Sequence, residues 1–147
     1  MSYLASTVDF KLEVPRVHGN TWHIYSDSDH AGDRGSDSAR SRTGVMILLN
    51  GMPVHWRSNK QPITSISSAQ AEIYAMSETA RDARLRLWVH EELGGTVAYP
   101  FHILVDNAAG ISFQSPTWQA SKLRGIFDVR DKWVKDLKDV DVLKAIK

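Results

Sequence analysis

The sequence has 147 residues, 42% of them hydrophobic and 24% charged, with a formal net charge of +1 at neutral pH. This length and balance are typical of one globular domain and argue against a disordered chain. The sequence has no cysteine, which excludes disulfides, cysteine-ligated zinc and thiol nucleophiles and fits a reducing compartment. No run approaches the ~20 apolar residues of a membrane span, and the N-terminus lacks a signal-peptide pattern, so we expect an intracellular domain.

The first twenty residues contain one run with strand character, Phe10–Val14, which ends at Pro15. Proline cannot donate a hydrogen bond to a sheet, so it confines such a run to a sheet edge or ends it. We predict that residues 1–20 form an N-terminal connecting segment. It is either the tail of a preceding segment or an edge strand of the domain formed by residues 21–147.

Three strands are predicted next. Residues 21–26 are rich in β-forming side chains and lead into a polar, turn-prone stretch. Residues 43–49 are apolar, and Asn50-Gly51, a strong hairpin signal, separates them from a partner strand at residues 54–58. Together these residues predict an antiparallel meander of three strands.

A long helix is predicted after the meander. Ser67 and Gln70 form a capping-box pattern at its start, and Gly94-Gly95 follows its end near Leu93. Apolar residues recur between these limits at spacings of three and four, which predicts one buried face: Ile73, Met76, Ala80, Ala83 and Leu87.

The remaining residues predict a strand, two helices and a last strand, at 101–106, 107–113, 127–137 and 140–146. A meander followed by alternating helices and strands is typical of an α/β fold with a mixed sheet flanked by helices. Because helical crossovers connect parallel strands, the fourth and fifth strands are expected to run parallel to the first.

Three carboxylates have special places in this order. Asp27 lies near the end of the first strand, Asp106 ends the fourth, and Glu72 lies in the first turns of the long helix. If the first and fourth strands are adjacent, Asp27 and Asp106 emerge together, and the helix can bring Glu72 to them. Three converging carboxylates repel one another unless a cation neutralises them, and oxygen-only ligands favour Mg²⁺ or Mn²⁺.

Each residue also has an ordinary structural interpretation. Asp106 could cap the helix that follows it, and Glu72 could be a solvated residue favoured by the helix dipole. Asp29 lies two residues after Asp27 and faces the same side of the strand, so composition does not decide between them. The six histidines show no metal-ligand spacing, although His30 falls in the loop beside Asp27.

The sequence resembles the ribonuclease H domain of copia-type LTR retrotransposon polyproteins, which also contain a reverse transcriptase. Separated blocks carry the resemblance in the right order: Tyr25–Asp29, Gly32–Asp33, Ser41–Gly44, Trp56–Gln61, Ser67–Ala75 and Val105–Asn107. The similarity runs from about Tyr25 to Val134. Residues 3–16 are also similar to the segment that joins the two enzymes in such polyproteins.

The resemblance implies a ribonuclease H-like sheet of strand order 3-2-1-4-5 and hydrolysis of RNA paired to DNA, with two Mg²⁺ or Mn²⁺ ions. It implies that Asp27, rather than Asp29, bridges both metals and that Glu72 and Asp106 complete the catalytic and metal-binding set. The residues that we expect to contact substrate lie beside these carboxylates: Ser28, His30, Gln70 and Asn107. The family also implies a reverse transcriptase domain as neighbour and a cytoplasmic, virus-like-particle setting.

The sequence departs from the family at its C-terminal end. The family has a fourth carboxylate on a helix after the fifth strand, and we expect it beyond Lys147, with that helix absent here. Apolar sheet surface would then be uncovered and could promote self-association. The alternative to a nuclease is a catalytically inactive ribonuclease H-like module that binds nucleic acid or a polyprotein partner.

Overall fold

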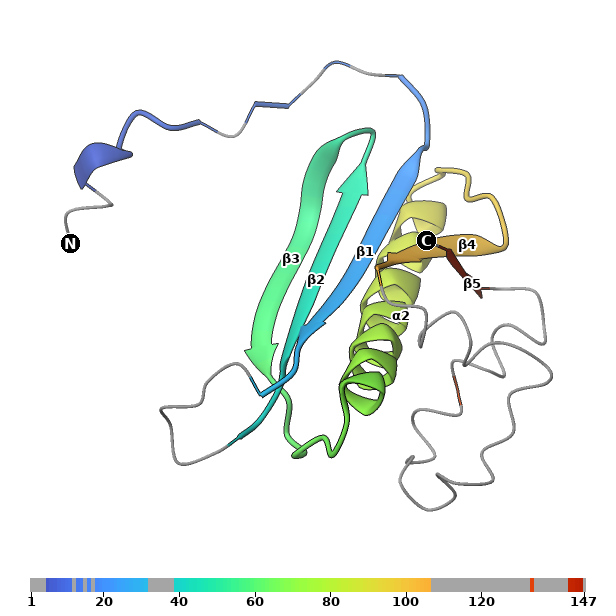
Figure 1. The fold of residues 1–147 in the computed structure, drawn as a ribbon. Helices are drawn as coiled ribbons and strands as arrows, with labels where there is room; N and C mark the ends of the chain where they lie inside the picture. The colour runs from blue at the N-terminus through green and yellow to red at the C-terminus, as the bar shows by residue number, and fades with distance from the viewer. Residues whose placement is uncertain are drawn as a thin grey trace.

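The structure is a computed structural model that describes residues 5–11, 13–14, 16, 18–31, 39–106, 133 and 143–146 (Figure 1). A mixed sheet of five strands forms its centre, in the order β3-β2-β1-β4-β5. β1 pairs antiparallel with β2 and parallel with β4, β2 pairs antiparallel with β3, and β4 pairs parallel with β5. The strands are β1 Trp22–Asp29, β2 Arg42–Leu49, β3 Met52–Lys60, β4 Phe101–Val105 and β5 Leu143–Ile146. The mixed sheet and its order confirm the prediction.

The β2–β3 turn forms where the Asn50-Gly51 pair predicts it. Both residues have positive φ angles, 53° and 81°, which asparagine and glycine tolerate and which suit the twist of a tight hairpin. The Asn50 side chain also binds the chain entering β1, since its Oδ1 accepts from Thr21 N–H at 2.9 Å and its Nδ2 donates to Gly19 O at 2.6 Å. The turn therefore fixes the point at which the N-terminal segment joins the sheet.

The long helix is α2, Ser68–Glu92, and it lies against one face of the sheet (Figure 1). Ser67 caps it as predicted, because its Oγ accepts from Gln70 N–H at 3.2 Å. The Gln70 side chain accepts from Ile66 N–H, one residue before the cap, at 2.9 Å. The helix ends before Gly94, whose φ of 83° places it in the left-handed region that glycine adopts easily.

The two faces of the sheet differ. The closed face, covered by α2, carries the buried side chains of Ile24, Val45, Ile47 and Ile103, which pack against the predicted apolar face of the helix. The core residues of that helix face are Ile73, Met76, Ala80, Ala83 and Leu87. The open face carries Tyr25, Met46 and Trp56, side by side in register across three strands and 40%, 39% and 62% exposed.

Ion pairs between β3 and α2 border the closed face. Arg57 contacts Asp82 at 2.9 Å and Glu78 at 3.2 Å, and His55 lies 3.3 Å from Asp82. These side chains are partly shielded from solvent, which strengthens such pairs relative to fully exposed ones. They hold the outermost strand to the middle of the helix.

Phe10–Val14 does not form an edge strand. None of its described residues has strand structure, and Phe10 and Val14 are 77% and 61% exposed. Phe10 N–H instead donates to Thr7 O at 3.0 Å in a turn. A strand requires a hydrogen-bonding partner, and within the part of the chain that the structure describes this run lies beside none.

Three other predictions concern the C-terminal third of the chain. The helix expected at 107–113 lies outside the described residues, as does that at 127–137 apart from Trp133, which is helical and packs partly buried against the core. The last strand is confirmed over Leu143–Ile146. Across the described ranges, no helix combines the length and apolar character needed to span a bilayer.

Candidate metal centre

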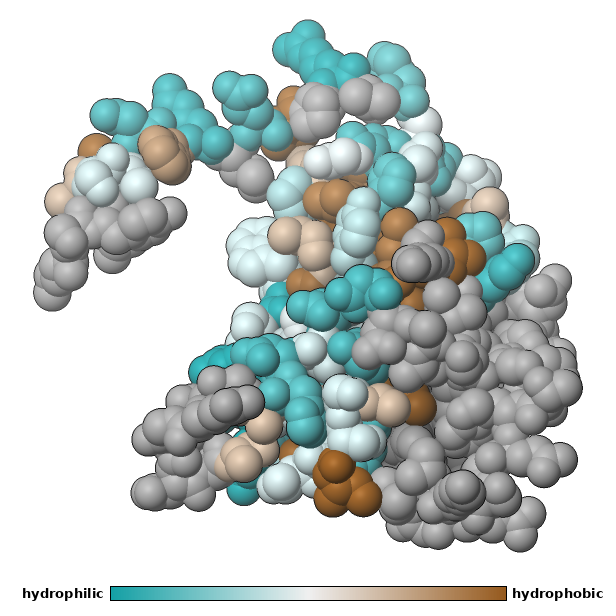
Figure 2. All heavy atoms as spheres, in the orientation of Figure 1, coloured by the Kyte–Doolittle hydropathy of each residue, from teal (hydrophilic) through white to brown (hydrophobic). Residues whose placement is uncertain are grey.

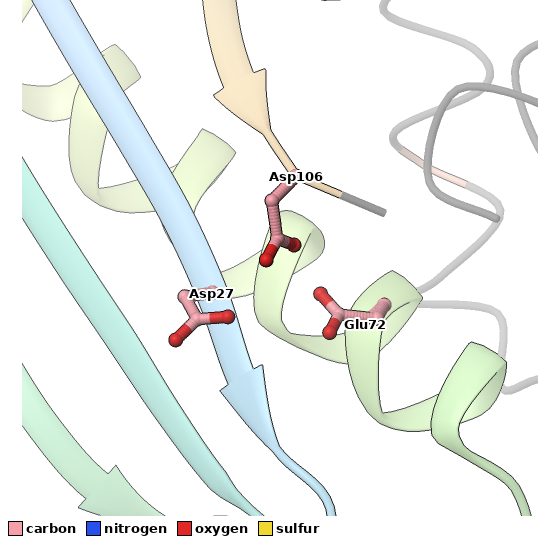
Figure 3. A group of neighbouring side chains, drawn as sticks. All are labelled: Asp27, Glu72 and Asp106. Carbon is pink, nitrogen blue, oxygen red and sulfur yellow. The ribbon is translucent and has the colours of Figure 1, made fainter. Parts of the chain in front are cut away.

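Three carboxylates converge at one end of the sheet (Figure 3). Asp27 comes from β1, Asp106 directly follows β4, and Glu72 comes from the first turns of α2. One ligand oxygen of each lies within 4.8 Å of those of the other two. Glu72 is buried, whereas both aspartates are exposed. The group therefore has one protected member and two that face solvent.

The parallel pairing of β1 and β4 brings the two aspartates together. Ser26 lies in register with Val105, so the residues that follow them, Asp27 and Asp106, leave the paired region side by side. Carboxyl ends of parallel strands meet at one edge of a sheet, which is where α/β folds place their ligands. On the other side of β1, Asp27 lies in register with Gly44, whose missing side chain leaves space beside the carboxylate.

A buried polar network holds the start of α2 beside these strands. Gln61, 1% exposed, donates from Nε2 to Ala71 O at 3.0 Å and to Thr43 Oγ1 at 3.2 Å. Its Oε1 accepts from Ser65 Oγ at 3.0 Å. One amide thus links β2, the loop before the helix and the residue preceding Glu72. Sequence reasoning missed this role of Gln61, and only its place in a family-like block marked it.

The electrostatics of the group disfavour three negative charges. Burial raises the pKa of Glu72 above its ordinary value of 4.5, and the nearby charges of Asp27 and Asp106 raise it further. The polar hydroxyl and N–H groups of Ser28 act in the opposite direction and lower the Glu72 pKa. A bound cation would remove the repulsion between the carboxylates. The site is therefore suited to a positive ligand.

The donor set fits a hard divalent ion. All three donors are carboxylates, and Mg²⁺ and Mn²⁺ prefer such oxygens, whereas histidine and cysteine ligands favour softer metals. His30 does not join the group: it is exposed, and its Nε2 lies 3.4 Å from Ser65 O. Among the described residues Asp29 is also outside it, although it lies on the same strand as Asp27.

The expected substrate contacts lie at different depths around the carboxylates. Ser28 is half-buried beside Glu72, and His30 is exposed in the turn after β1. Gln70 is buried, with its Oε1 engaged by Ile66 N–H, so it supports the loop before α2. Asn107 lies outside the described residues.

Two hollows on the open face border Asp27. One, of about 360 Å³, is lined on the β2 and β3 side by Gly44, Met46, Trp56 and Ser58. The other, of about 410 Å³, lies towards β4 and includes Leu104 and Asp106. Asp27 and Asp106 are thus reached from the open face, whereas the buried Glu72 lines neither hollow.

Comparisons with known proteins link the sequence to mobile elements. The chain is 32% identical over 107 residues to the retrovirus-related Pol polyprotein from transposon RE2 of Arabidopsis thaliana, covering 73% of this chain and 7% of that protein. It is 27% identical over 125 residues to the Pol polyprotein from transposon TNT 1-94 of Nicotiana tabacum, 84% of this chain and 9% of the other. It is 41% identical over 83 residues to secreted RxLR effector protein 161 of Plasmopara viticola, 56% and 57% of the two lengths. No family model matches the sequence.

Solved structures give the fold. The chain is similar to LC11-RNase H1, isolated from compost by a metagenomic approach, with a TM-score of 0.50 and 17% identity over 87% of this chain and 84% of that one. The same enzyme in complex with an RNA/DNA hybrid gives a TM-score of 0.53, with 86% and 83% covered. The fold is that of ribonuclease H, and the expected resemblance to the ribonuclease H domain of a retrotransposon polyprotein is confirmed.

Proposed function

Because the chain combines the ribonuclease H fold with similarity to a segment of retrotransposon Pol polyproteins, we propose that it hydrolyses the RNA strand of RNA–DNA hybrids during reverse transcription. The observation that supports this most strongly is the convergence of Asp27, Glu72 and Asp106 at the ends of adjacent strands and the start of α2. A fold alone hosts many activities, whereas a carboxylate cluster in this position has a specific chemical use.

We propose that the three carboxylates hold two divalent ions, with Asp27 contacting both and Glu72 and Asp106 completing one of the sites. Such ions, when bound, stabilise the charge that develops during in-line displacement at a phosphodiester. The protein's own contribution is to fix the ligands. The Gln61 network fixes the helix that carries Glu72, and the β1–β4 pairing fixes the two aspartates. The second ion needs further oxygen ligands from water, substrate or another carboxylate.

The proposed substrate is a hybrid duplex. A ribonuclease H must distinguish RNA from DNA by the 2′-hydroxyl and the A-like minor groove. We propose that Ser28, His30 and Gln70, which lie near Asp27 and Glu72 in the sequence, contact the sugar and backbone of the hybrid. In a polyprotein the domain would act beside a covalently attached reverse transcriptase, which would supply its hybrid.

The proposal is tested by incubating the chain with a hybrid whose RNA strand is labelled, in Mg²⁺ or in Mn²⁺. The same RNA in single-stranded form and a DNA duplex serve as substrate controls. We expect metal-dependent cleavage of the hybrid RNA alone, lowered at least about 100-fold by Asp27→Asn. Asp29→Asn is the matched control, since it removes a charge from the same strand outside the carboxylate group.

Hybrid binding with no cleavage in either metal would instead support the alternative of a catalytically inactive binding module. Equal losses in Asp27→Asn and Asp29→Asn would contradict the assignment of Asp27.

A further inference from the structure

β3 forms one edge of the sheet in the part of the chain that the structure describes. β3 is the outermost strand on its side of the sheet and spans nine residues. Such an edge presents backbone N–H and C=O groups that can accept another strand, although in β3 Pro53 has no N–H and Val54 has no partner in β2, because the β2–β3 register shifts there. Its open-face side chains Val54 and Trp56 are 37% and 62% exposed, and Arg57 borders the closed face.

The segment Phe10–Val14 has the pattern that this edge requires. Phe10, Leu12 and Val14 are apolar and alternate with the charged residues Lys11 and Glu13. This period of two places all the apolar side chains on one side of an extended chain. In the structure Phe10 and Val14 are largely exposed, and Figure 2 shows the N-terminal segment standing apart from the body.

The anchor at Asn50 directs the segment towards β3. Gly19 and Thr21 are hydrogen-bonded to Asn50 in the β2–β3 turn, and Figure 1 shows the chain before them passing on towards the side of β3. Four residues separate Val14 from Gly19. They span up to ~13 Å when extended, whereas neighbouring strands lie ~4.8 Å apart. The segment can therefore reach the outer edge of β3 in its own chain.

We propose that Phe10–Val14 docks on β3 of the same chain as a sixth strand. The segment runs towards the β2–β3 turn and β3 runs away from it, so the pairing is antiparallel. Phe10 then lies opposite Trp56 and Leu12 opposite Val54, with their side chains on the open face. A slip of one residue would turn every apolar side chain to the other face, so the pattern excludes it.

Charge supports the same register on the closed face. Asp9 falls opposite Arg57, and Lys11 falls opposite His55, whose ring contacts Asp82. Asp9 thus meets an opposite charge at the rim of the existing ion-pair group, whereas Lys11 meets the ring of His55, which Arg86 Nη2 already contacts at 2.8 Å.

A short tether favours pairing within one chain, because it gives the segment a millimolar effective concentration at the edge. Ordering five residues costs conformational entropy and opens the turn bond from Phe10 N–H to Thr7 O. The gain is a few half-buried apolar contacts. The docked and undocked arrangements therefore exchange, and the structure shows the undocked one. Docking would place Phe10 over Trp56, at the border of the hollow beside Asp27.

Cysteine crosslinking tests the register, since the natural chain has no cysteine. The pair Leu12→Cys and Val54→Cys places two thiols directly opposite each other in the proposed strand pair, within the range that a disulfide bridges. The control pair is Leu12→Cys with Ser58→Cys, four residues further along the edge. We expect the first pair to form an intramolecular disulfide at least about 10-fold faster than the second under mild oxidation.

Equal rates for the two pairs, or no crosslink, would overturn the proposal. A crosslinked dimer from the first pair would overturn it too, because the segment would then act on a second copy.

Hydrogen exchange gives a test without cysteines. Phe10→Ser should speed exchange of the β3 edge amides relative to the natural chain, while Val8→Ser, an equally exposed substitution just before the segment, should not. Identical exchange in both variants would contradict the pairing. Neither experiment depends on nuclease activity.

Discussion

The closed and open faces of the sheet are made by the same strands but differ in what they do. Along β1, Ile24 and Ser26 face α2 and are buried, while Tyr25 and Asp27, which alternate with them, face outward and are exposed. The closed face supplies the apolar packing and the buried network that position Glu72, and the open face presents Asp27 and Asp106 to a ligand. Because successive side chains of β1 point to opposite faces, residues that stabilise the fold and residues that bind a ligand lie on different sides of the sheet. We therefore expect substitutions on the two faces to have different effects.

The largest effect on stability is expected in the closed-face core. Ile73→Ala removes a side chain that is 2% exposed and leaves a cavity between α2 and the sheet. We expect the free energy of unfolding to fall by about 2–5 kcal/mol. Urea unfolding followed by circular dichroism measures it, and a loss below about 1 kcal/mol would show that the face packs less tightly than the structure indicates.

A smaller loss is expected from the network that links the closed face to the site. Gln61→Leu keeps the volume but leaves Ala71 O and the Ser65 hydroxyl without their Gln61 partner. Unsatisfied buried groups of this kind cost about 1–3 kcal/mol. Unfolding free energy measures the cost, and hybrid cleavage should fall more steeply than stability because Glu72 loses its support. An unchanged cleavage rate would separate Gln61 from the site.

Substituting the buried carboxylate of Glu72 should stabilise the metal-free protein, unlike the two substitutions above. Because burial and the two aspartates raise the pKa of Glu72, its charged form is disfavoured in the folded, metal-free chain. That penalty is absent below the ordinary value of 4.5 and develops as the pH rises through the raised folded value. Glu72→Gln should therefore raise the melting temperature in EDTA at neutral pH, with the difference vanishing in acid. A lower melting temperature for the variant at neutral pH would contradict this electrostatic account.

The smallest effect on stability is expected on the exposed open face. Trp56 is 62% exposed, so Trp56→Ser should change the unfolding free energy by about 0.5 kcal/mol or less. Thermal unfolding beside Ile73→Ala sharpens the contrast between the faces. A loss comparable to that of Ile73→Ala would mean that Trp56 is covered most of the time in solution, rather than only while Phe10 is docked.

The sequence predicts the features whose signals are local. Asn50-Gly51 marks the hairpin, and Ser67 with Gln70 marks the start of α2, because each acts through its own backbone neighbourhood. Phe10–Val14 also has strand character, but its described residues have no strand structure, because a strand additionally needs a hydrogen-bonding partner in place. Local pattern alone is therefore sufficient for caps and turns but not for pairing.

Only part of the site could be predicted from the sequence. The expectation that β1 and β4 are adjacent and parallel was enough to predict that Asp27 and Asp106 lie together. The choice of Asp27 over Asp29 as the metal ligand needed the family resemblance. The Gln61 network was missed because a buried amide in contact with three separate segments leaves no spacing pattern in the sequence.

The central claim is that Asp27, Glu72 and Asp106 form one divalent-metal centre. Calorimetric titration of the natural chain with Mn²⁺ tests it most directly, beside Asp27→Asn, Asp106→Asn and the control Asp29→Asn. The account predicts binding by the natural chain and by Asp29→Asn, and a loss of at least about 10-fold in affinity for each of the other two. Undiminished binding by either Asp27→Asn or Asp106→Asn would contradict it.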